Sequence, residues 1–207
     1  MSTVLVVTSS TMGEASVSNQ LIDHALQRLR AADPDLKIVT RDLAAQPVPH
    51  LTADSTAAVR GAEPANDAQA EARALSDALV AELKAADTVI IGAPMYNFGI
   101  PSTLKAWFDH VLRAGVTFRY GENGPEGLLP GKKTVVIESR GGLYSEGPAM
   151  PMDSQEPHLR TMLGFMGITD VSFVRAEKLG YGPEARDAAI AAAQSAIGES
   201  FAARLAA

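Results

Sequence analysis

Three short segments carry side chains that could together hold a ligand, and each of them directly follows a run of apolar residues. The first, residues 9–18, is rich in hydroxyl groups, and the second, residues 95–98, has two aromatic rings and an amide. The third, residues 139–142, has two glycines and an arginine. Hydroxyl groups donate to anions, aromatic rings offer flat apolar surface, and glycines let a ligand approach the backbone closely.

The first segment is suited to a terminal phosphate group. Ser10, Ser16 and Ser18 surround the expected start of a helix, where free N–H groups and the positive end of the helix dipole favour an anion. No lysine or arginine lies in this segment, which suits a monophosphate held by neutral donors. It contains neither a GxxxxGK motif nor a GxGxxG motif, so an ATP or dinucleotide site is not supported. The alternative is that Ser16 or Ser18 simply caps the helix.

The second and third segments are suited to a planar heterocycle. Tyr96 and Phe98 offer flat surface, and the Asn97 amide can both donate to and accept from imide edges. In the third segment the glycines allow close approach, and Arg140 could supply a fixed positive charge. Each segment also has a simpler interpretation, namely aromatic residues that close the core and an ordinary Gly-Gly turn with a solvated arginine. A ligand explains all three segments at once, so we favour it.

The elements that must position these segments alternate between strand and helix. Apolar runs predict strands at residues 4–7, 36–40, 88–92, 133–138 and 169–174. Amphipathic spacing predicts helices from Ser16 or Ser18 to Pro34, at 67–84, at 101–112, at 158–166 and from 183 onwards. We expect Pro94 to end the third strand, Pro101 and Ser102 to start the third helix, and Gly115 to end it. Residues 120–131 and 143–157 are rich in turn-forming residues and predict irregular connections.

Five strands that alternate with five helices predict an α/β fold, a three-layer sandwich with a five-stranded parallel sheet. Right-handed crossovers favour a flavodoxin-like strand order, 2-1-3-4-5. In that order the carboxyl ends of the first, third and fourth strands lie side by side. The three ligand-binding segments follow those three ends, so we expect them to form one site.

Length and composition narrow the class of protein. The chain has 207 residues, of which 46% are hydrophobic, and we expect a single domain over residues 1–207. The formal net charge of −6 argues against a nucleic-acid partner. There is no cysteine, and the four histidines lack ligand spacing, so thiol chemistry is excluded and no metal site is expected. The first apolar run is too short for a signal peptide or a membrane span, so a cytoplasmic protein is expected.

Longer stretches of the sequence resemble the FMN-dependent NADH:quinone oxidoreductases, a bacterial family also called azoreductases. The segments that carry the resemblance are APMYNFGIPSTLKAWFDHVLRAGVTFRY, ENGPEGLLPGKK, SRGG, LGFMGI and the serines of the first segment. The resemblance covers nearly the whole chain and implies a flavodoxin-like homodimer with one FMN per subunit at the dimer interface. The sequence departs from the family pattern in residues 143–158, which are longer and richer in Met and Pro, and at Met162, where an aromatic residue is common.

The resemblance also assigns roles to individual residues. The phosphate and ribityl end of FMN would be held by Ser10, Ser16, Val17 and Ser18. The isoalloxazine ring would be held by Met95, Tyr96, Asn97 and Phe98 together with Ser139, Arg140, Gly141 and Gly142. Phe118 and Tyr120 match family positions near the substrate. No side chain is implied as an obligate catalytic acid or base.

The reaction implied by the resemblance is a ping-pong, two-electron reduction. NADH would give a hydride to N5 of tightly bound FMN and leave, and a quinone or azo compound would then take both electrons. Arg140 or backbone amides would stabilise the anionic reduced ring. A flavodoxin-like one-electron carrier and a flavin-sensing module are the alternatives. The two long connections favour a built substrate pocket over the carrier, and steady NADH oxidation with a quinone would exclude the sensing module.

Aromatic residues suggest how the chain assembles. Trp107, Phe108, Phe118 and Tyr120 offer more aromatic surface than one core face beside the site should need, and aromatic residues are enriched at interfaces. Together with the resemblance, this predicts a two-fold homodimer that completes each flavin pocket.

Overall fold

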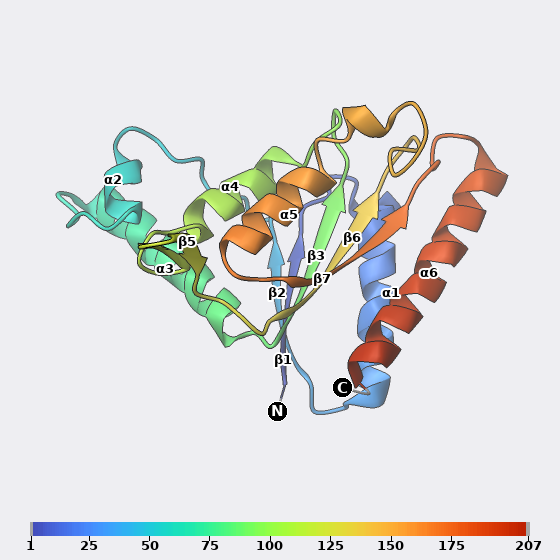
Figure 1. Ribbon diagram of the computed structural model, residues 1–207, viewed down its shortest axis with the longest axis horizontal. Coiled ribbons are helices and arrows are strands. Elements are labelled where there is room, and N and C mark those ends of the chain that lie inside the picture. The colour runs from blue at the N-terminus through green and yellow to red at the C-terminus, as the bar shows by residue number, and fades with distance from the viewer. Residues whose placement is uncertain (1, 206–207) are drawn as a thin grey trace.

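The fold is built on one central parallel sheet. The structure is a computed structural model that describes residues 2–205, with side chains as far as Phe201 at the C-terminal end. Its sheet has the order β2-β1-β3-β6-β7, and every neighbouring pair is parallel (Figure 1). The strands are β1 (Thr3–Thr8), β2 (Lys37–Asp42), β3 (Thr88–Pro94), β6 (Lys133–Ser139) and β7 (Asp170–Ala176). The predicted α/β class and the flavodoxin-like strand order are therefore confirmed.

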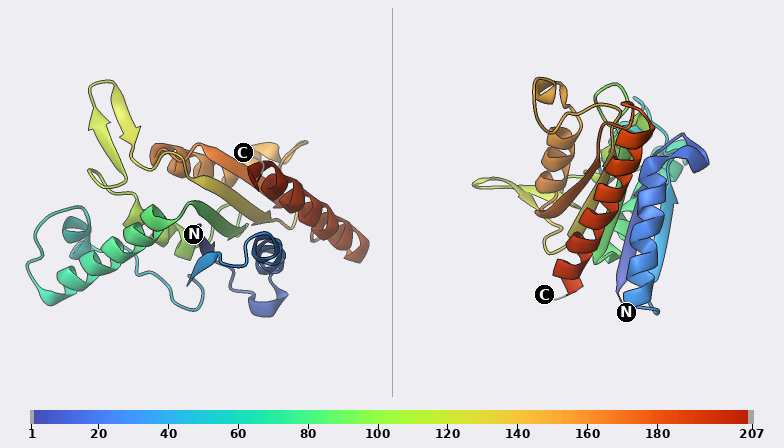
Figure 2. Two further views of the ribbon diagram at one scale, coloured as in Figure 1. Left: turned by 90° about the horizontal axis from the view of Figure 1, so that it is seen from below. Right: turned by 90° about the vertical axis from the view of Figure 1, so that its right-hand side faces the viewer.

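Helices cover both faces of the sheet and make it the middle of three layers. One face is covered by α1 (Val17–Ala32) and α6 (Pro183–Leu205), which lie side by side in Figure 2. The other face is covered by α3 (Asp67–Ala85), α4 (Ser102–Val111) and α5 (Glu156–Phe165). No helix within the described residues is both long enough and apolar enough to cross a membrane.

The alternation of side chains along β1 shows why the strand sequence is apolar throughout. Val4 and Val6 pack in the core beneath α1 and α6, whereas Leu5 and Val7 pack in the core beneath α3, α4 and α5. Successive side chains of a strand point to opposite faces, so a strand covered on both faces needs apolar residues at every position. The predicted buried strands are found for this reason.

The connection between α4 and β6 is more regular than its composition indicates. Residues 120–131 were expected to be irregular, but β4 (Phe118–Gly121) and β5 (Gly124–Gly127) form an antiparallel hairpin. A Cβ atom at Gly127 would lie only 2.0 Å from the Gly167 nitrogen, which follows α5. The glycine therefore permits a close contact between two backbones, a role that composition cannot distinguish from that of a loop glycine.

Several predicted ends of elements are wrong. Strand β3 ends at Pro94 as expected, but it extends past the predicted bound at Gly92, because a missing N–H removes only one bond at the end of a strand. Ser102 is the first residue of α4 and makes no cap, and α4 ends at Val111. Gly115 lies beyond the helix, in a turn where its N–H donates to the Phe118 carbonyl over 2.7 Å.

Three further helical segments were not expected, and one helix starts earlier. The predicted loop before α3 contains the short helix α2 (Ser55–Val59), and 3₁₀ turns lie at η1 (Gly13–Ala15) and η2 (Met150–Met152). Helix α5 begins at Glu156 because the Asp153 carboxylate accepts from the N–H groups of Gln155 (2.8 Å) and Glu156 (3.1 Å).

Candidate functional site

The three segments identified in the sequence meet at one edge of the sheet. The Ser9 hydroxyl donates to the Gly92 carbonyl over 2.7 Å and so joins the first segment to the end of β3. The Thr11 N–H donates to the Tyr96 hydroxyl over 3.0 Å and joins the first segment to the second. The Met95 N–H donates to the Ser139 carbonyl over 2.9 Å and joins the second to the third. The strand order predicted this convergence, and direct contacts hold it together.

The first segment places hydroxyl groups around the start of α1. Ser16 is the N-cap, and its Oγ atom accepts from the Asn19 N–H over 3.2 Å. Ser18 lies inside the first turn, and its Oγ atom is 3.1 Å from that of Ser16. Ser10, Ser16 and Ser18 are all buried. The capping interpretation is therefore right for Ser16 and wrong for Ser18.

This arrangement suits an anion. The first N–H groups of a helix have no partners within the helix, and those of Val17 and Ser18 lie at the start of α1. The first turn has no acidic side chain to repel a negative charge. Ser18 makes no cap, so its hydroxyl group can donate to a ligand at the positive end of the helix dipole.

The second segment is a tight turn with an unusual backbone. Tyr96 and Gly99 exchange two backbone hydrogen bonds of 2.9 and 3.1 Å. Between them, Asn97 and Phe98 have φ angles of 48° and 71°, in the left-handed region that residues other than glycine rarely adopt. Such strain is concentrated at functional sites. The Asn97 side chain is exposed and the Phe98 ring is 42% exposed, so both are available to a ligand.

Tyr96 has a second role that the sequence did not reveal. Its hydroxyl group accepts from Thr11, and the Thr11 Oγ1 atom is also 3.0 Å away, so the ring spans the first and second segments. Burial raises the pKa of the Tyr96 phenol, but hydrogen bonds from Thr11 and Ser10 outweigh burial and lower it. No spacing rule links Thr11 to Tyr96, because they are 85 residues apart.

The third segment presents open backbone. Its carbonyl groups at Gly141 and Gly142 accept from the N–H groups of Gly180 and Lys178, each over 2.9 Å. A Cβ atom at Gly141 would meet no described protein atom within 4 Å, so the backbone there faces open space. The backbone at Gly141 therefore leaves room for a flat ligand, whereas a Cβ atom at Gly142 would lie 3.0 Å from the Tyr144 ring.

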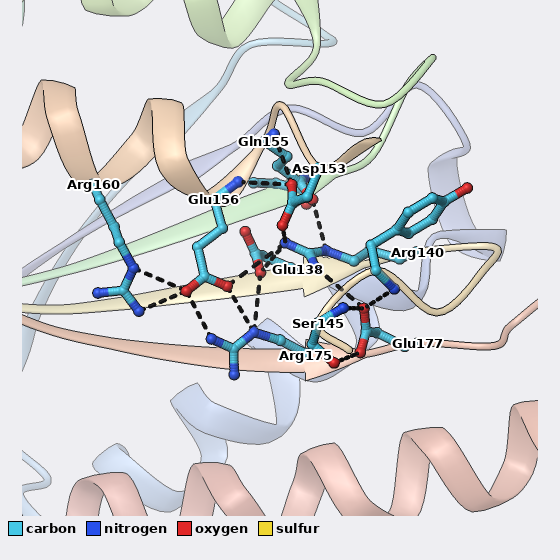
Figure 3. A network of polar contacts seen from close by, with 11 residues as sticks. Glu138, Arg140, Ser145, Asp153, Gln155, Glu156, Arg160, Arg175 and Glu177 are labelled. Atoms are coloured by element: carbon cyan, nitrogen blue, oxygen red, sulfur yellow. Dashed lines mark hydrogen bonds and ion pairs between the residues drawn. The ribbon is translucent and has the colours of Figure 1, made fainter. Parts of the chain in front are cut away.

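The expected role of the Arg140 side chain is wrong. The side chain is 0% exposed and lies beneath the third segment (Figure 3). Its guanidinium group contacts Glu138 Oε2 (2.7 Å) and Gln155 Oε1 (2.9 Å). It also contacts Asp153 Oδ2 (3.1 Å) and Glu177 Oε1 (3.2 Å). These partners bind the charge completely, so Arg140 supports the segment from below and does not offer its charge to a ligand.

Glu138 is the residue of this cluster that the sequence should have revealed. It lies at the end of a buried strand, two residues before Arg140, so both side chains point to the same face. Burial, with a smaller contribution from the carboxylates of Glu156 and Asp153, raises the pKa of Glu138 to about 8, although Arg140 opposes the shift. A charged residue that directly follows the apolar run of a buried strand signals a buried partner.

Phe118 and Tyr120 are not brought to the three segments within one chain. Helix α4 runs from the second segment towards the hairpin, so the hairpin lies at the far end of α4 (Figure 1). Phe118 packs edge-on against Phe165, with ring centroids 4.6 Å apart, and Tyr120 is 75% exposed. Trp107 and Phe108 are buried in the core, so the argument that they supply interface surface is wrong.

Comparison with known proteins identifies the family. The model of a protein family described as having a flavodoxin-like fold matches residues 2–201. The FMN-dependent NADH:quinone oxidoreductase of Hyphomonas neptunium is 60% identical over 197 residues, which cover 95% of this chain and 94% of that protein. The protein of the same name from Escherichia coli O139:H28 is 52% identical over 198 residues, which cover 95% and 97%.

The chain belongs to the FMN-dependent NADH:quinone oxidoreductase family. Solved structures agree with this conclusion. An azoreductase from Bacillus anthracis str. Sterne has a TM-score of 0.88 and 30% identity, and the match covers 96% of this chain and 98% of that one. An FMN-dependent NADH-azoreductase from Bacillus anthracis str. Ames Ancestor, solved in complex with FMN, has a TM-score of 0.85 and 26% identity, with coverage of 96% and 99%.

The site fits the cofactor that gives the family its name. FMN has a terminal phosphate and a planar ring, and this member of the FMN-dependent NADH:quinone oxidoreductase family has a hydroxyl-rich helix start beside a strained turn and an open glycine backbone. The resemblance inferred from the sequence segments is confirmed.

Proposed function

We propose that this protein is an FMN-dependent NADH:quinone oxidoreductase that also cleaves azo compounds reductively. The observation that carries the proposal is the convergence of three segments, an anion-binding helix start, a left-handed turn and open backbone at Gly141, at one sheet edge. Relatives that are 50–60% identical over nearly the whole chain support it. When bound, FMN supplies the two-electron chemistry, taking a hydride from NADH and delivering both electrons to a quinone or an azo bond.

The first segment would hold the phosphate and the ribityl chain. The hydroxyl groups of Ser10, Ser16 and Ser18 and the N–H groups of Val17 and Ser18 are neutral donors at the positive end of α1. Neutral donors hold a dianion without burying a compensating cation. They also favour a ligand with one phosphate, FMN rather than FAD.

The second and third segments would hold the ring. Met95, Tyr96, Asn97 and Phe98 provide the turn along one side, and the Asn97 amide can pair with the polar edge of the ring. The backbone atoms of Ser139, Gly141 and Gly142 would lie against the ring. Because Arg140 is occupied by carboxylates, backbone N–H groups are the donors that would stabilise negative charge on the ring.

We further propose a homodimer in which the hairpin of one subunit lies near the ring bound by the other. Tyr120 is exposed on the β4–β5 hairpin, which stands away from the body of the subunit in Figure 2. The hairpin borders a pocket of about 360 Å³ lined by residues that include Leu112, Phe118 and Phe165. A second subunit would cover this aromatic surface and bring Phe118 and Tyr120 to the substrate side. The reaction would take place in the cytoplasm, where NADH is kept.

The test is an anaerobic titration of the purified protein. We expect a yellow protein whose heat-released chromophore has the mass of FMN, and whose absorbance is bleached by an equivalent of NADH and restored by an equivalent of a quinone. A colourless protein, or one that releases FAD, would contradict the cofactor assignment. A flavin that passes only single electrons and leaves the quinone unreduced would instead support a one-electron carrier.

A further inference from the structure

A buried polar cluster lies directly beneath the third segment. It connects the end of β6, the segment before α5 and the end of β7, which are far apart in the sequence (Figure 3). We call it the Arg140 cluster, and its members are Glu138, Arg140, Asp153, Gln155, Glu156, Arg175 and Glu177. Apart from Arg140, none of these residues belongs to the three ligand-binding segments.

Gln155 is the member that spans two of those segments. It is fully buried, and its Nε2 atom donates to the Ala93 carbonyl over 2.7 Å. Its Oε1 atom accepts from Arg140 Nε over 2.9 Å. Ala93 lies two residues before the second segment, and Arg140 lies within the third. One amide side chain therefore joins the end of β3, next to the second segment, to the third segment through both of its polar atoms.

The residues next to Gln155 make the same connection. The Ser154 N–H donates to the Phe98 carbonyl over 3.0 Å, within the strained turn. Asp153 Oδ2 lies 3.1 Å from Arg140 Nη2, while its Oδ1 atom accepts from the first N–H groups of α5. Residues 153–155 are thus fixed to a helix on one side and contact both segments on the other.

We propose that Gln155 is a positioning residue for the flavin, which holds the second and third segments at the separation that the isoalloxazine ring requires. This inference rests on the proposed function, because it assigns a role in holding the same cofactor. Gln155 is fully buried, so it would act on the flavin through Ala93 and Arg140 and not by direct contact. Buried and fully paired polar groups fix a unique geometry more strictly than apolar packing does.

Because carboxylates also hold Arg140, one of the two contacts of Gln155 can be removed without the other. Glu177 Oε1 accepts from Arg140 Nη1 (3.2 Å) and from the Tyr144 N–H (2.8 Å), and Glu138 holds Nη2. Arg140, and the third segment with it, therefore remains held when the Gln155 contact to Ala93 is lost. Removing that contact should loosen the end of β3 and the second segment that follows it, while the other bonds of that segment, such as Met95 N–H to the Ser139 carbonyl, keep it in place.

Two variants of Gln155 and one control test the proposal. Gln155→Glu keeps an acceptor for Arg140 but places an oxygen opposite the Ala93 carbonyl, so only the contact to the second segment is lost. Gln155→Leu removes both contacts. Arg160→Gln is the control, because Arg160 pairs with Glu156 at the exposed side of the cluster and lies outside the three segments. Each protein is stripped of flavin and titrated with FMN and with riboflavin, well below its melting temperature.

We expect Gln155→Glu to weaken FMN and riboflavin alike by roughly tenfold, which corresponds to one lost buried hydrogen bond. Riboflavin should suffer equally because the contact lies at the ring and not at the phosphate. Gln155→Leu should weaken both flavins at least as much, and the visible circular dichroism of the bound flavin should change in both variants. Arg160→Gln should bind both flavins as the parent does.

Other outcomes would overturn the proposal. A lower melting temperature with unchanged affinity for both flavins would make Gln155 a residue that only stabilises the fold. A loss confined to FMN, or an equal loss in Arg160→Gln, would also contradict a positioning role at the ring. A parent protein that binds no flavin would overturn the proposed function and this inference with it, whereas normal flavin binding by the parent and all variants would overturn this inference alone.

Discussion

The assignment of the first segment to a phosphate can be tested at Ser18. This residue is buried in the first turn of α1, 3.1 Å from the Ser16 hydroxyl, and is not the cap. Ser18→Asp replaces a donor with a negative charge beside the proposed phosphate. Ser18→Asn is the matched control, because asparagine has the shape of aspartate without its charge.

The expected loss of FMN affinity follows from the short distance between the new carboxylate and the proposed phosphate. Two unit charges about 4 Å apart repel by about 4 kcal/mol at an effective dielectric constant of about 20. Partial protonation of the aspartate would reduce this repulsion, so we expect Ser18→Asp to bind FMN at least about a hundredfold more weakly than Ser18→Asn. Both changes leave the Ser16 cap in place, and the positive end of the helix dipole offsets part of the cost of burying a carboxylate in the first turn.

The assay is titration of each flavin-free variant with FMN and with riboflavin. Riboflavin has no phosphate, so the two variants should bind it with the same affinity. Equal losses of FMN in Ser18→Asp and Ser18→Asn would refute the reasoning, because they would show that no negative charge of the ligand lies near Ser18.

Three further predictions concern the cluster beneath the site and the hairpin. Arg140→Met leaves buried carboxylates unpaired and should lower the free energy of unfolding by about 3–5 kcal/mol in urea, whereas Arg119→Met, in an exposed ion pair, should cost less than about 1 kcal/mol. The pKa of Glu138 in the folded state is raised from 4.5 to about 8, so its contribution to stability should be lost as the pH rises through that range. Glu138→Gln should therefore remove this pH dependence of the free energy of unfolding, measured in urea between those pH values. Tyr120→Ser should shift light scattering towards monomer at a given concentration. Tyr181→Ser changes another exposed tyrosine, on the α6 side, and should not. An unchanged dimer in Tyr120→Ser would exclude the hairpin from the interface.

The sheet and the convergence of the three segments could be predicted because they depend on strong, local patterns. Strands covered on both faces require uninterrupted apolar runs, as in β1 and β3, and right-handed crossovers then leave few possible strand orders. Once the strand order is known, it determines which strands have neighbouring carboxyl ends. The chemistry of the segments could therefore be combined before any coordinates were known.

The contacts beneath the site could not be predicted, because they join distant parts of the chain. Arg140 meets Glu177, 37 residues later, and Gln155 meets Ala93, 62 residues earlier. Nothing local distinguishes a buried arginine of this kind from a solvated one, except the charged Glu138 directly after the apolar run of β6. The β4–β5 hairpin was not predicted for another reason. Gly127 permits a close contact between two backbones, but the stretch around it has the composition of a loop.

The packing of α6 against α1 has a consequence for the order in which the protein is made. Ile197 and Phe201 of α6 close the core that Leu21 and Ile22 of α1 begin, yet α6 leaves the ribosome after all the strands of the sheet. Until then, one side of the sheet is only half covered, although the residues of the three segments have already been synthesised. A nascent chain that pauses before residue 183 therefore exposes a broad apolar surface, and it is at this stage that the protein should depend most on chaperones.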